Sequence, residues 1–224
     1  MADEADQAIK QLRGLIRGEL VIGASTIPGE YILPPILAEF KEKYPGIQMN
    51  LLIADTKEII QKVVDNKVEI GIVGTKSKSD KLIFSNFTTE KLVLIAPHDC
   101  NWLKGESATI EELKKFPFVL RESGSGTRAS MRQKLDEAGI KETDLKIVMK
   151  LGSTAAVKKA VESGAGVSII SEKAIENEIK LGLIKKIHVK GLELDREFFI
   201  VCRRHTYRNP ATKAFLQFLE ERRL

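Results

Sequence analysis

The sequence has few cysteines and no long apolar segment. Its two cysteines, Cys100 and Cys202, are too few for a disulfide framework and too far apart for a zinc or redox pair. No stretch approaches the roughly 18 uninterrupted apolar residues that a membrane-spanning helix needs. Residues 1–6 are acidic, whereas a signal peptide opens with a basic segment. We therefore expect a soluble protein of a reducing cytoplasm that has no membrane partner.

The signature motifs of several enzyme classes are also missing. The three histidines, His98, His188 and His205, form no H-E-x-x-H pair, and there is no G-x-S-x-G or G-x-x-x-x-G-K-[ST] segment. Residues 124–129 fit the dinucleotide fingerprint G-x-G-x-x-A, but the next expected strand ends without the acidic residue that binds the ribose. We predict no metal site, no cofactor and no catalytic residue, although acid or base catalysis by an Asp or Glu stays open.

What the sequence does have is the composition of an ordinary globular protein. Of its 224 residues, 43% are hydrophobic and 30% are charged, which excludes a disordered or fibrous chain. The length fits one large domain or two half-size lobes. The formal net charge is +5, and much of the excess lies from Arg196 onward. This charge permits a nucleic-acid partner without requiring one, because only a basic face would indicate it.

Strands and helices alternate in two stretches of the chain. The first stretch has apolar runs typical of buried strands at residues 19–24, 47–53 and 68–73, separated by amphipathic helices. The second stretch repeats the pattern with expected strands at residues 116–120, 145–149 and 166–170. Right-handed strand–helix–strand crossovers build a parallel sheet. The fold class is therefore α/β, with two small lobes of similar build.

Several further elements are expected outside these two stretches. Asp55 with Glu58, and Thr109 with Glu112, have the capping-box spacing that marks a helix start. An amphipathic helix is expected over residues 5–17 and another over 211–221, with strands at residues 82–84, 91–97 and 197–202.

Polar loops follow four of the expected strands. Ligands of open α/β sheets bind beyond the carboxyl ends of the strands, and three of these loops lead into helices. A helix N-terminus presents free N–H groups and the positive end of the helix dipole, which suits a small anion. We therefore predict a binding cleft between the lobes, formed by Ser25, Thr26, Thr75, Ser123, Gly124, Ser125, Gly126, Thr127, Arg128, Gly152, Ser153 and Thr154.

A purely structural explanation competes with this one. Ser and Thr are common N-cap residues whatever a protein does, so for each loop taken alone capping is the favoured interpretation. The loop at residues 123–128 differs, because its two glycines, three hydroxyls and one cation exceed what a single cap needs. Glu122 is the only carboxylate expected beside it. Such a lining is better suited to holding a ligand than to transforming it.

The order of several segments resembles a known family. These segments are residues 19–25, 31–45, 68–74, 92–97, 121–128, 152–158 and 164–171. Together they resemble the effector-binding domain of LysR-type transcriptional regulators. The resemblance covers nearly the whole chain from about residue 19, and the order of the segments is more specific than any one of them.

The resemblance implies a type II periplasmic-binding-protein-like fold, in which two Rossmann-like lobes are joined by two crossover strands. Lobe I would be residues 19–95 plus 200–224, and lobe II would be residues 96–199. Residues 1–18 would be the remnant of a linker helix. The family's usual polar positions coincide with the predicted site at Ser25, Thr26, Thr75, residues 125–128, Ser153 and Thr154.

The resemblance also implies a regulatory function and no enzymatic one. A small anionic effector would bind between the lobes and rearrange a homodimer formed through lobe I, which becomes a tetramer in a full-length protein. DNA would be bound only by an N-terminal helix-turn-helix domain that this chain lacks. The pattern is most similar to regulators of sulfur, selenium or carbon dioxide assimilation, and we favour the selenium-associated branch. Ile27 replaces a hydroxyl of cysteine-pathway members, which argues against sulfate as the effector.

Two other functions occur on the same fold. A solute-binding component of a transporter shares the lobes and the cleft, but the acidic N-terminus does not resemble a signal peptide. A prephenate-dehydratase-like enzyme has a Thr-Arg-Phe motif, which residues 127–129, Thr-Arg-Ala, match only in part.

Overall fold

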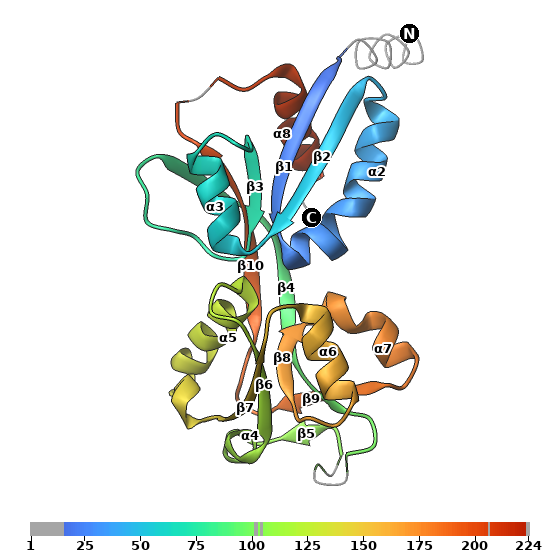
Figure 1. Ribbon diagram of the computed structural model, residues 1–224, viewed down its shortest axis with the longest axis vertical. Coiled ribbons are helices and arrows are strands. Elements are labelled where there is room, and N and C mark those ends of the chain that lie inside the picture. Colours follow the sequence, from blue (N-terminus) through green and yellow to red (C-terminus); the bar gives the residue numbers. More distant parts are fainter. Residues whose placement is uncertain (1–15, 101–102, 104, 206, 223–224) are drawn as a thin grey trace. The chain divides into compact units, whose positions relative to one another are not determined.

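The chain forms two compact units. The computed structural model in Figure 1 describes residues 16–100, 103, 105–205 and 207–222. Unit 1 comprises Met1–Thr88 and Phe198–Leu224, and unit 2 comprises Thr89–Glu197. The strands β4 (Leu82–Pro97) and β10 (Asp195–Arg203) each contribute residues to both units. The helix expected over residues 5–17 falls almost wholly outside the described residues.

Unit 1 contains the first expected parallel sheet. β1 (Gly18–Ser25) lies between β2 (Ile47–Ala54) and β3 (Ile70–Val73), parallel to both, and β10 runs antiparallel to β3. The strands expected in this stretch are confirmed, apart from small shifts of their ends. This agreement follows from the β-branched residues of β1 and β3, which favour strands. All four residues of β3 are buried.

The helices of unit 1 begin where the sequence supplies caps. Asp55 accepts a hydrogen bond from the N–H of Glu58 at 2.9 Å and opens α3 (Thr56–Val64). Asn209 caps α8 (Pro210–Glu221) in the same way. The expected helix from Pro28 onward is in two parts, because a π-helical turn η1 (Pro28–Ile32) precedes α2 (Leu33–Lys43).

Unit 2 contains the second parallel arrangement. β6 (Pro117–Arg121) pairs with β7 (Lys146–Leu151) in parallel, and backbone hydrogen bonds of Val167 with Pro117 and Val119, both 2.8 Å, place the start of β8 (Ser168–Ser171) beside β6. The part of β4 in this unit runs antiparallel to β8 and to β9 (Ile184–Val189). A short β5 (Ser107–Ala108) pairs with β9.

The helices of unit 2 connect these strands. α5 (Gly126–Glu137) and a 3-10 turn η2 (Glu142–Asp144) lead from β6 to β7, and α6 (Thr154–Glu162) leads from β7 to β8. Thr109 and Glu112 form the expected capping box at the start of α4 (Ile110–Lys115). After β8 come η3 (Glu172–Ile175) and α7 (Glu176–Lys180).

The structure corrects the sequence analysis at β4. Residues 82–84 and 91–97 were expected to be two strands, whereas they belong to one strand of 16 residues. Residues 85–91, which are polar except for Phe87, interrupt the apolar pattern, and only Glu90 among them is buried. β5, β9 and α7 were not predicted. In β9, Lys185, Lys186 and His188 interrupt the apolar alternation that would indicate a strand.

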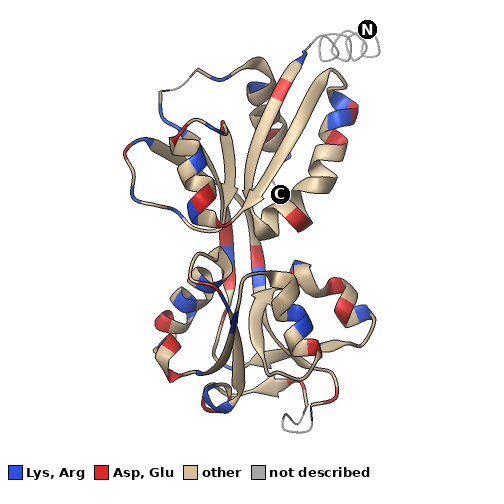
Figure 2. Ribbon diagram, in the orientation of Figure 1, with Lys and Arg blue, Asp and Glu red and all other residues tan. Residues whose placement is uncertain are grey.

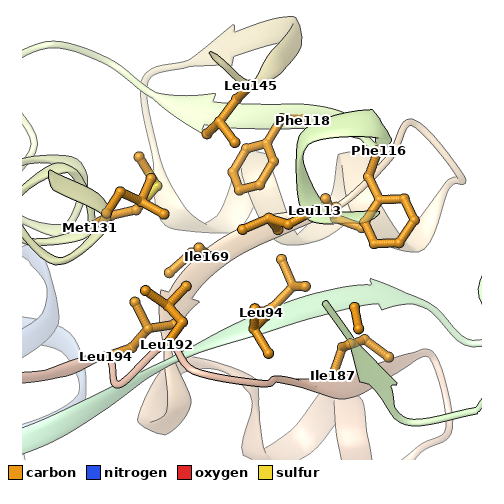
Figure 3. Packing of buried hydrophobic residues seen from close by; sticks show 14 of the residues in the cluster. Leu94, Leu113, Phe116, Phe118, Met131, Leu145, Ile169, Ile187, Leu192 and Leu194 are labelled. Carbon is orange, nitrogen blue, oxygen red and sulfur yellow. The ribbon is translucent and has the colours of Figure 1, made fainter. Parts of the chain in front are cut away.

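Each unit has its own hydrophobic core. In unit 1, Phe40 packs edge-on against Phe215 with 5.1 Å between the ring centroids, which holds α8 against α2. In unit 2, Leu94 of β4, Phe118 of β6 and Ile169 of β8 belong to a single cluster with Leu113 and Met131 (Figure 3). These cores fix the ends of the strands, where the polar loops begin.

Charged residues of both signs occur on the helices of each unit (Figure 2). Figure 2 shows Lys and Arg interspersed with Asp and Glu along the helices of each unit, so the excess of basic residues is not gathered on one helix. Among the described residues, no helix has both the length and the apolar character to cross a membrane.

Candidate functional site

Two of the predicted site loops leave unit 2 at the same edge. β6 and β7 are parallel, and Arg121 at the end of β6 is opposite Leu151 at the end of β7. The N–H of Glu122 donates to the Leu151 carbonyl at 3.0 Å, which ties the two loops together as they leave the sheet. The structure therefore brings Ser123, Gly124, Ser125, Gly126, Thr127 and Arg128 to the same edge as Gly152, Ser153 and Thr154.

Both loops open helices, and their serines are caps. The Ser125 hydroxyl accepts from the N–H of Arg128 at 3.3 Å at the start of α5. The Ser153 hydroxyl accepts from the N–H of Ala156 at 3.1 Å at the start of α6. The capping interpretation is thus correct for these two residues. The same arrangement directs the N-termini of two α-helices toward one edge, where their dipoles favour an anion.

Arg121 lies beneath this edge as a buried cation. Its side chain is 5% exposed, and its Nη1 donates to the Thr154 hydroxyl at 2.6 Å. Its Nε and Nη2 donate to the two carboxylate oxygens of Glu122 at 2.8 and 2.7 Å. Arg121 was not among the predicted site residues. A basic residue that ends an apolar strand directly before a glycine loop is the signal that could have identified it.

Arg128, which was expected to bind an effector, already has a partner in the protein. Its Nε and Nη2 donate to the Glu142 carboxylate at 3.0 and 2.5 Å, and its Nη1 donates to the Arg121 carbonyl at 3.2 Å. The hydrogen bonds from Arg128 lower the pKa of Glu142 and raise that of Arg128 itself. Arg128 therefore braces the loop against η2.

Thr127 leads into a buried polar network. Its hydroxyl accepts from Nη1 of Arg196 at 3.3 Å. Nε of Arg196 donates to the Glu90 carboxylate at 2.5 Å, and the Ser171 hydroxyl donates to the same carboxylate at 2.7 Å. Burial lowers the pKa of Arg196, whereas the charge and hydrogen bond of Glu90 raise it, and the nearby charge of Arg121 lowers it further.

This network was also missed by the sequence analysis. Glu90 and Arg196 lie on β4 and β10, the two strands with residues in both units, and Figure 2 shows the charged residues on these strands. Their side chains are 1% and 4% exposed. Charged residues next to apolar strand segments give a local signal, but the sequence does not show that they pair.

The predicted site residues of unit 1 also share an edge. Ser25 is the last residue of β1, opposite Ala54 of β2, and Ala24 is opposite Ile72 of β3. Thr26 directly follows β1, and Thr75 follows β3 after one glycine. Ser25 is buried, whereas Thr26 and Thr75 are partly exposed. The carboxyl ends of the parallel strands therefore bring Ser25, Thr26 and Thr75 to one edge of unit 1.

A cavity of about 730 Å³ opens elsewhere in unit 2. Its walls include Lys91, Lys173, Glu176 and Asp195, together with Lys186 and Glu172, which form an ion pair of 2.7 Å. With Glu90 its walls carry four carboxylates against three lysines, so the cavity has no excess of positive charge to attract an anion. The described residues contain no group of three His, Cys, Asp or Glu side chains that could hold a metal ion.

Comparison with known families identifies the fold. The model of the LysR substrate binding domain family matches residues 13–223. The chain belongs to this family. It is 31% identical over 218 residues to a probable RuBisCO transcriptional regulator of Cyanidium caldarium, covering 96% of this chain and 69% of that protein.

This LysR-type domain is also similar to two further proteins. The Synechocystis PCC6803 CcmR regulatory domain in complex with 2-PG has 25% sequence identity and a TM-score of 0.82, covering 92% of this chain and 98% of that one. A phosphonates import ATP-binding protein, PhnC of Anaeromyxobacter dehalogenans, is 35% identical over 200 residues. That match covers 89% of this chain but only 40% of PhnC. The G-x-x-x-x-G-K-[ST] motif of ATP-binding loops does not occur in this chain.

These similarities decide several predictions. The α/β fold matches that of LysR effector-binding domains, and the chain is such a domain. The family consists of regulators, in agreement with the prediction that the chain is not an enzyme. None of these three proteins is named for selenium metabolism, so that assignment stays a prediction.

Proposed function

We propose that this LysR-type domain senses a small anionic metabolite at the carboxyl-end loops of its parallel strands. The observation that carries the proposal is the convergence, at one edge of unit 2, of two helix N-termini and a hydroxyl-rich loop above the buried cation of Arg121. Backbone N–H groups at helix starts and a guanidinium together suit an anion. No histidine lies in these loops to act as a general base.

The contacts that we propose come from both units. In unit 2 the loop from Ser123 to Arg128 and the segment from Gly152 to Thr154 supply N–H groups and hydroxyls, with Arg128 bracing the loop. In unit 1 we assign the same role to Ser25, Thr26 and Thr75, which share an edge of the sheet there. The complex of the CcmR regulatory domain with 2-PG supports a small ligand for this fold.

The proposed response to the effector is a change of conformation of the regulator. We propose that the ligand favours one arrangement of the units, which requires different affinities for two conformations. The chain spans 69% of the Cyanidium caldarium regulator, and we propose that DNA is bound by a further domain of the full protein. Two such chains would associate through unit 1 in the cytoplasm, and a full-length protein would form a tetramer.

The test compares two buried threonines by calorimetry. Thr127→Val removes the hydroxyl at the start of α5, and Thr212→Val removes one at the start of α8, where it bonds Glu69. With 2-PG, inorganic phosphate and methylphosphonate as probes, we expect Thr127→Val to weaken binding at least about tenfold, the loss of a hydrogen bond to a charged group. Thr212→Val should bind as the wild type does.

Several results would reject the proposal. Equal affinities of wild type and Thr127→Val would remove the glycine loop from the site. If none of the probes bound to the wild type, the proposal that the effector is a small anion would be rejected. Turnover of prephenate by the purified chain would instead establish an enzyme.

A further inference from the structure

We propose that Arg121 determines the charge specificity of the effector, and that Glu122 occupies its guanidinium until an anionic ligand displaces it. The inference rests on the proposed function, because it concerns the same edge of unit 2. Arg121 would recognise the ligand, and Glu122 would compete with the ligand for its guanidinium.

The geometry of the pair is that of a bound anion. Nε and Nη2 of Arg121 donate to the two oxygens of Glu122 at 2.8 and 2.7 Å. This parallel pair of hydrogen bonds is the way in which a guanidinium binds a carboxylate or a phosphate. Glu122 thus holds the position that a ligand carboxylate, phosphate or phosphonate would take.

The two partners differ in how firmly they are held. Arg121 has a side chain that is 5% exposed, and Thr154 accepts a hydrogen bond from its Nη1 at 2.6 Å. The side chain of Glu122 is 34% exposed. Its carboxylate can return to water at low cost, whereas Arg121 cannot follow it. A buried guanidinium without a counter-charge is strongly unfavourable, so an acid is favoured at this position with or without ligand.

Neighbouring ion pairs of unit 2 show that this asymmetry is specific. Arg128 and Glu142 have side chains 16% and 18% exposed, and Arg196 and Glu90 have side chains 4% and 1% exposed. In these pairs both partners are enclosed by the protein. Only the Arg121 pair of the three joins an enclosed cation to a solvated carboxylate.

The backbone of Glu122 allows the exchange without refolding. Its N–H donates to the Leu151 carbonyl at 3.0 Å, and its carbonyl accepts from the N–H of Ser125 at 3.2 Å. The main chain is therefore fixed on both sides while the side chain can rotate away. The position that Glu122 would vacate is at Nε and Nη2 of Arg121, whose Nη1 donates to the Thr154 hydroxyl at the N-terminus of α6.

This arrangement defines the class of ligand. The ligand must carry at least one negative charge and two oxygens on one atom, as a carboxylate, phosphate or phosphonate does. A neutral ligand cannot replace Glu122, because it would leave the buried guanidinium without a counter-charge.

The decisive variant is Glu122→Gln. It keeps the size of the side chain and removes the charge that competes with the ligand. We expect calorimetry to show 2-PG and inorganic phosphate binding about tenfold more tightly than to the wild type, because a like charge beside the ligand is lost. Arg121→Lys keeps the charge but not the parallel hydrogen bonds, and it should weaken binding about tenfold or more.

The matched control is Glu178→Gln, the same substitution in the ion pair with Lys158, whose side chains are 20% and 15% exposed. It should give no gain in affinity. An equal gain in Glu178→Gln would show a general effect of charge and would overturn the displacement. Unchanged or weaker binding by Glu122→Gln, with Thr127→Val still defective, would also overturn it while leaving the proposed function intact. Absence of binding to both wild type and Glu122→Gln would overturn both.

Discussion

Arg196 donates from Nη1 to the hydroxyl of Thr127 at 3.3 Å. This hydrogen bond joins β10 to the first turn of α5, and the ion pair of Arg196 with Glu90 extends the connection to β4. β4 and β10 are the strands that contribute residues to both units. A ligand at the glycine loop, as proposed, would contact a helix turn that is bonded directly to β10 and through Arg196 to β4, which gives the proposed response a physical route.

The ion pair of Glu90 and Arg196 should be costly to break but not to replace. Glu90→Leu leaves Arg196 buried without its counter-charge, and we expect it to lower the free energy of unfolding by about 3–5 kcal/mol. The double variant Glu90→Leu/Arg196→Met removes both charges and should recover much of this loss. Urea denaturation of the wild type, Glu90→Leu, Arg196→Met and the double variant measures the difference. Losses that simply add in the double variant would show that the two side chains do not act as a pair.

Glu142 should make stability depend on pH. The hydrogen bonds from Arg128 lower its pKa from the ordinary value of 4.5 in the folded protein. A carboxylate with a lowered pKa stabilises the fold above its unfolded pKa, and this contribution is lost as the pH falls through the folded value. We therefore expect Glu142→Gln to be less stable than the wild type at pH 7, and the gap to narrow below about pH 4.5. Thermal unfolding at several pH values measures the gap.

Other acidic groups do not disturb this comparison. Glu112 and Glu137 also have lowered pKa values, but both proteins contain them, so their contributions cancel in the difference. A gap that stays constant from pH 7 to about pH 3 would show that the Glu142 charge contributes no stability.

The strands and caps that could be predicted from sequence are those in which local pattern and burial agree. β1 and β6 were predictable because apolar residues fill them and polar loops follow, so the edge that carries Ser25 and the edge that carries Ser123 could both be expected. The caps at Asp55 and Thr109 were predictable because a cap acts over three residues of sequence.

The rest depends on contacts between residues far apart in the sequence. Glu90, Thr127 and Arg196 meet in one network, and no spacing pattern indicates that they do. The partner of Arg128 was missed for the same reason, since Glu142 belongs to a turn that the sequence did not predict. A cation in a glycine loop looks the same in sequence whether it binds a ligand or a carboxylate of the protein.

Gly166 should be intolerant of any side chain. Its φ of +146° is unfavourable for other residues, and an added Cβ would collide with the Pro117 carbonyl. That carbonyl accepts from the N–H of Val167 at 2.8 Å, where the chain joins β6. We expect Gly166→Ala to lower the free energy of unfolding by at least about 2 kcal/mol.

Gly152 provides the control for this substitution. An added Cβ there has no atom within 4 Å, and Gly152→Ala should change stability by less than about 0.5 kcal/mol. Equal stability of the two variants in urea would show that the strand β8 can move away from β6 at no cost.

Ile53 provides a test of the proposed association through unit 1. β2 is at one end of the strand order, and Ile53 on it is 45% exposed, so an apolar side chain lies on an edge strand of the sheet that the structure describes. A carboxylate buried in an interface costs several kcal/mol, so Ile53→Glu should dissociate a dimer that uses this edge. Ile83→Glu is the matched control, because Ile83 is 41% exposed on β4. Light scattering should give about twice 25.0 kDa for the wild type and Ile83→Glu, and 25.0 kDa for Ile53→Glu. A monomeric wild type, or a dimeric Ile53→Glu, would contradict association through β2.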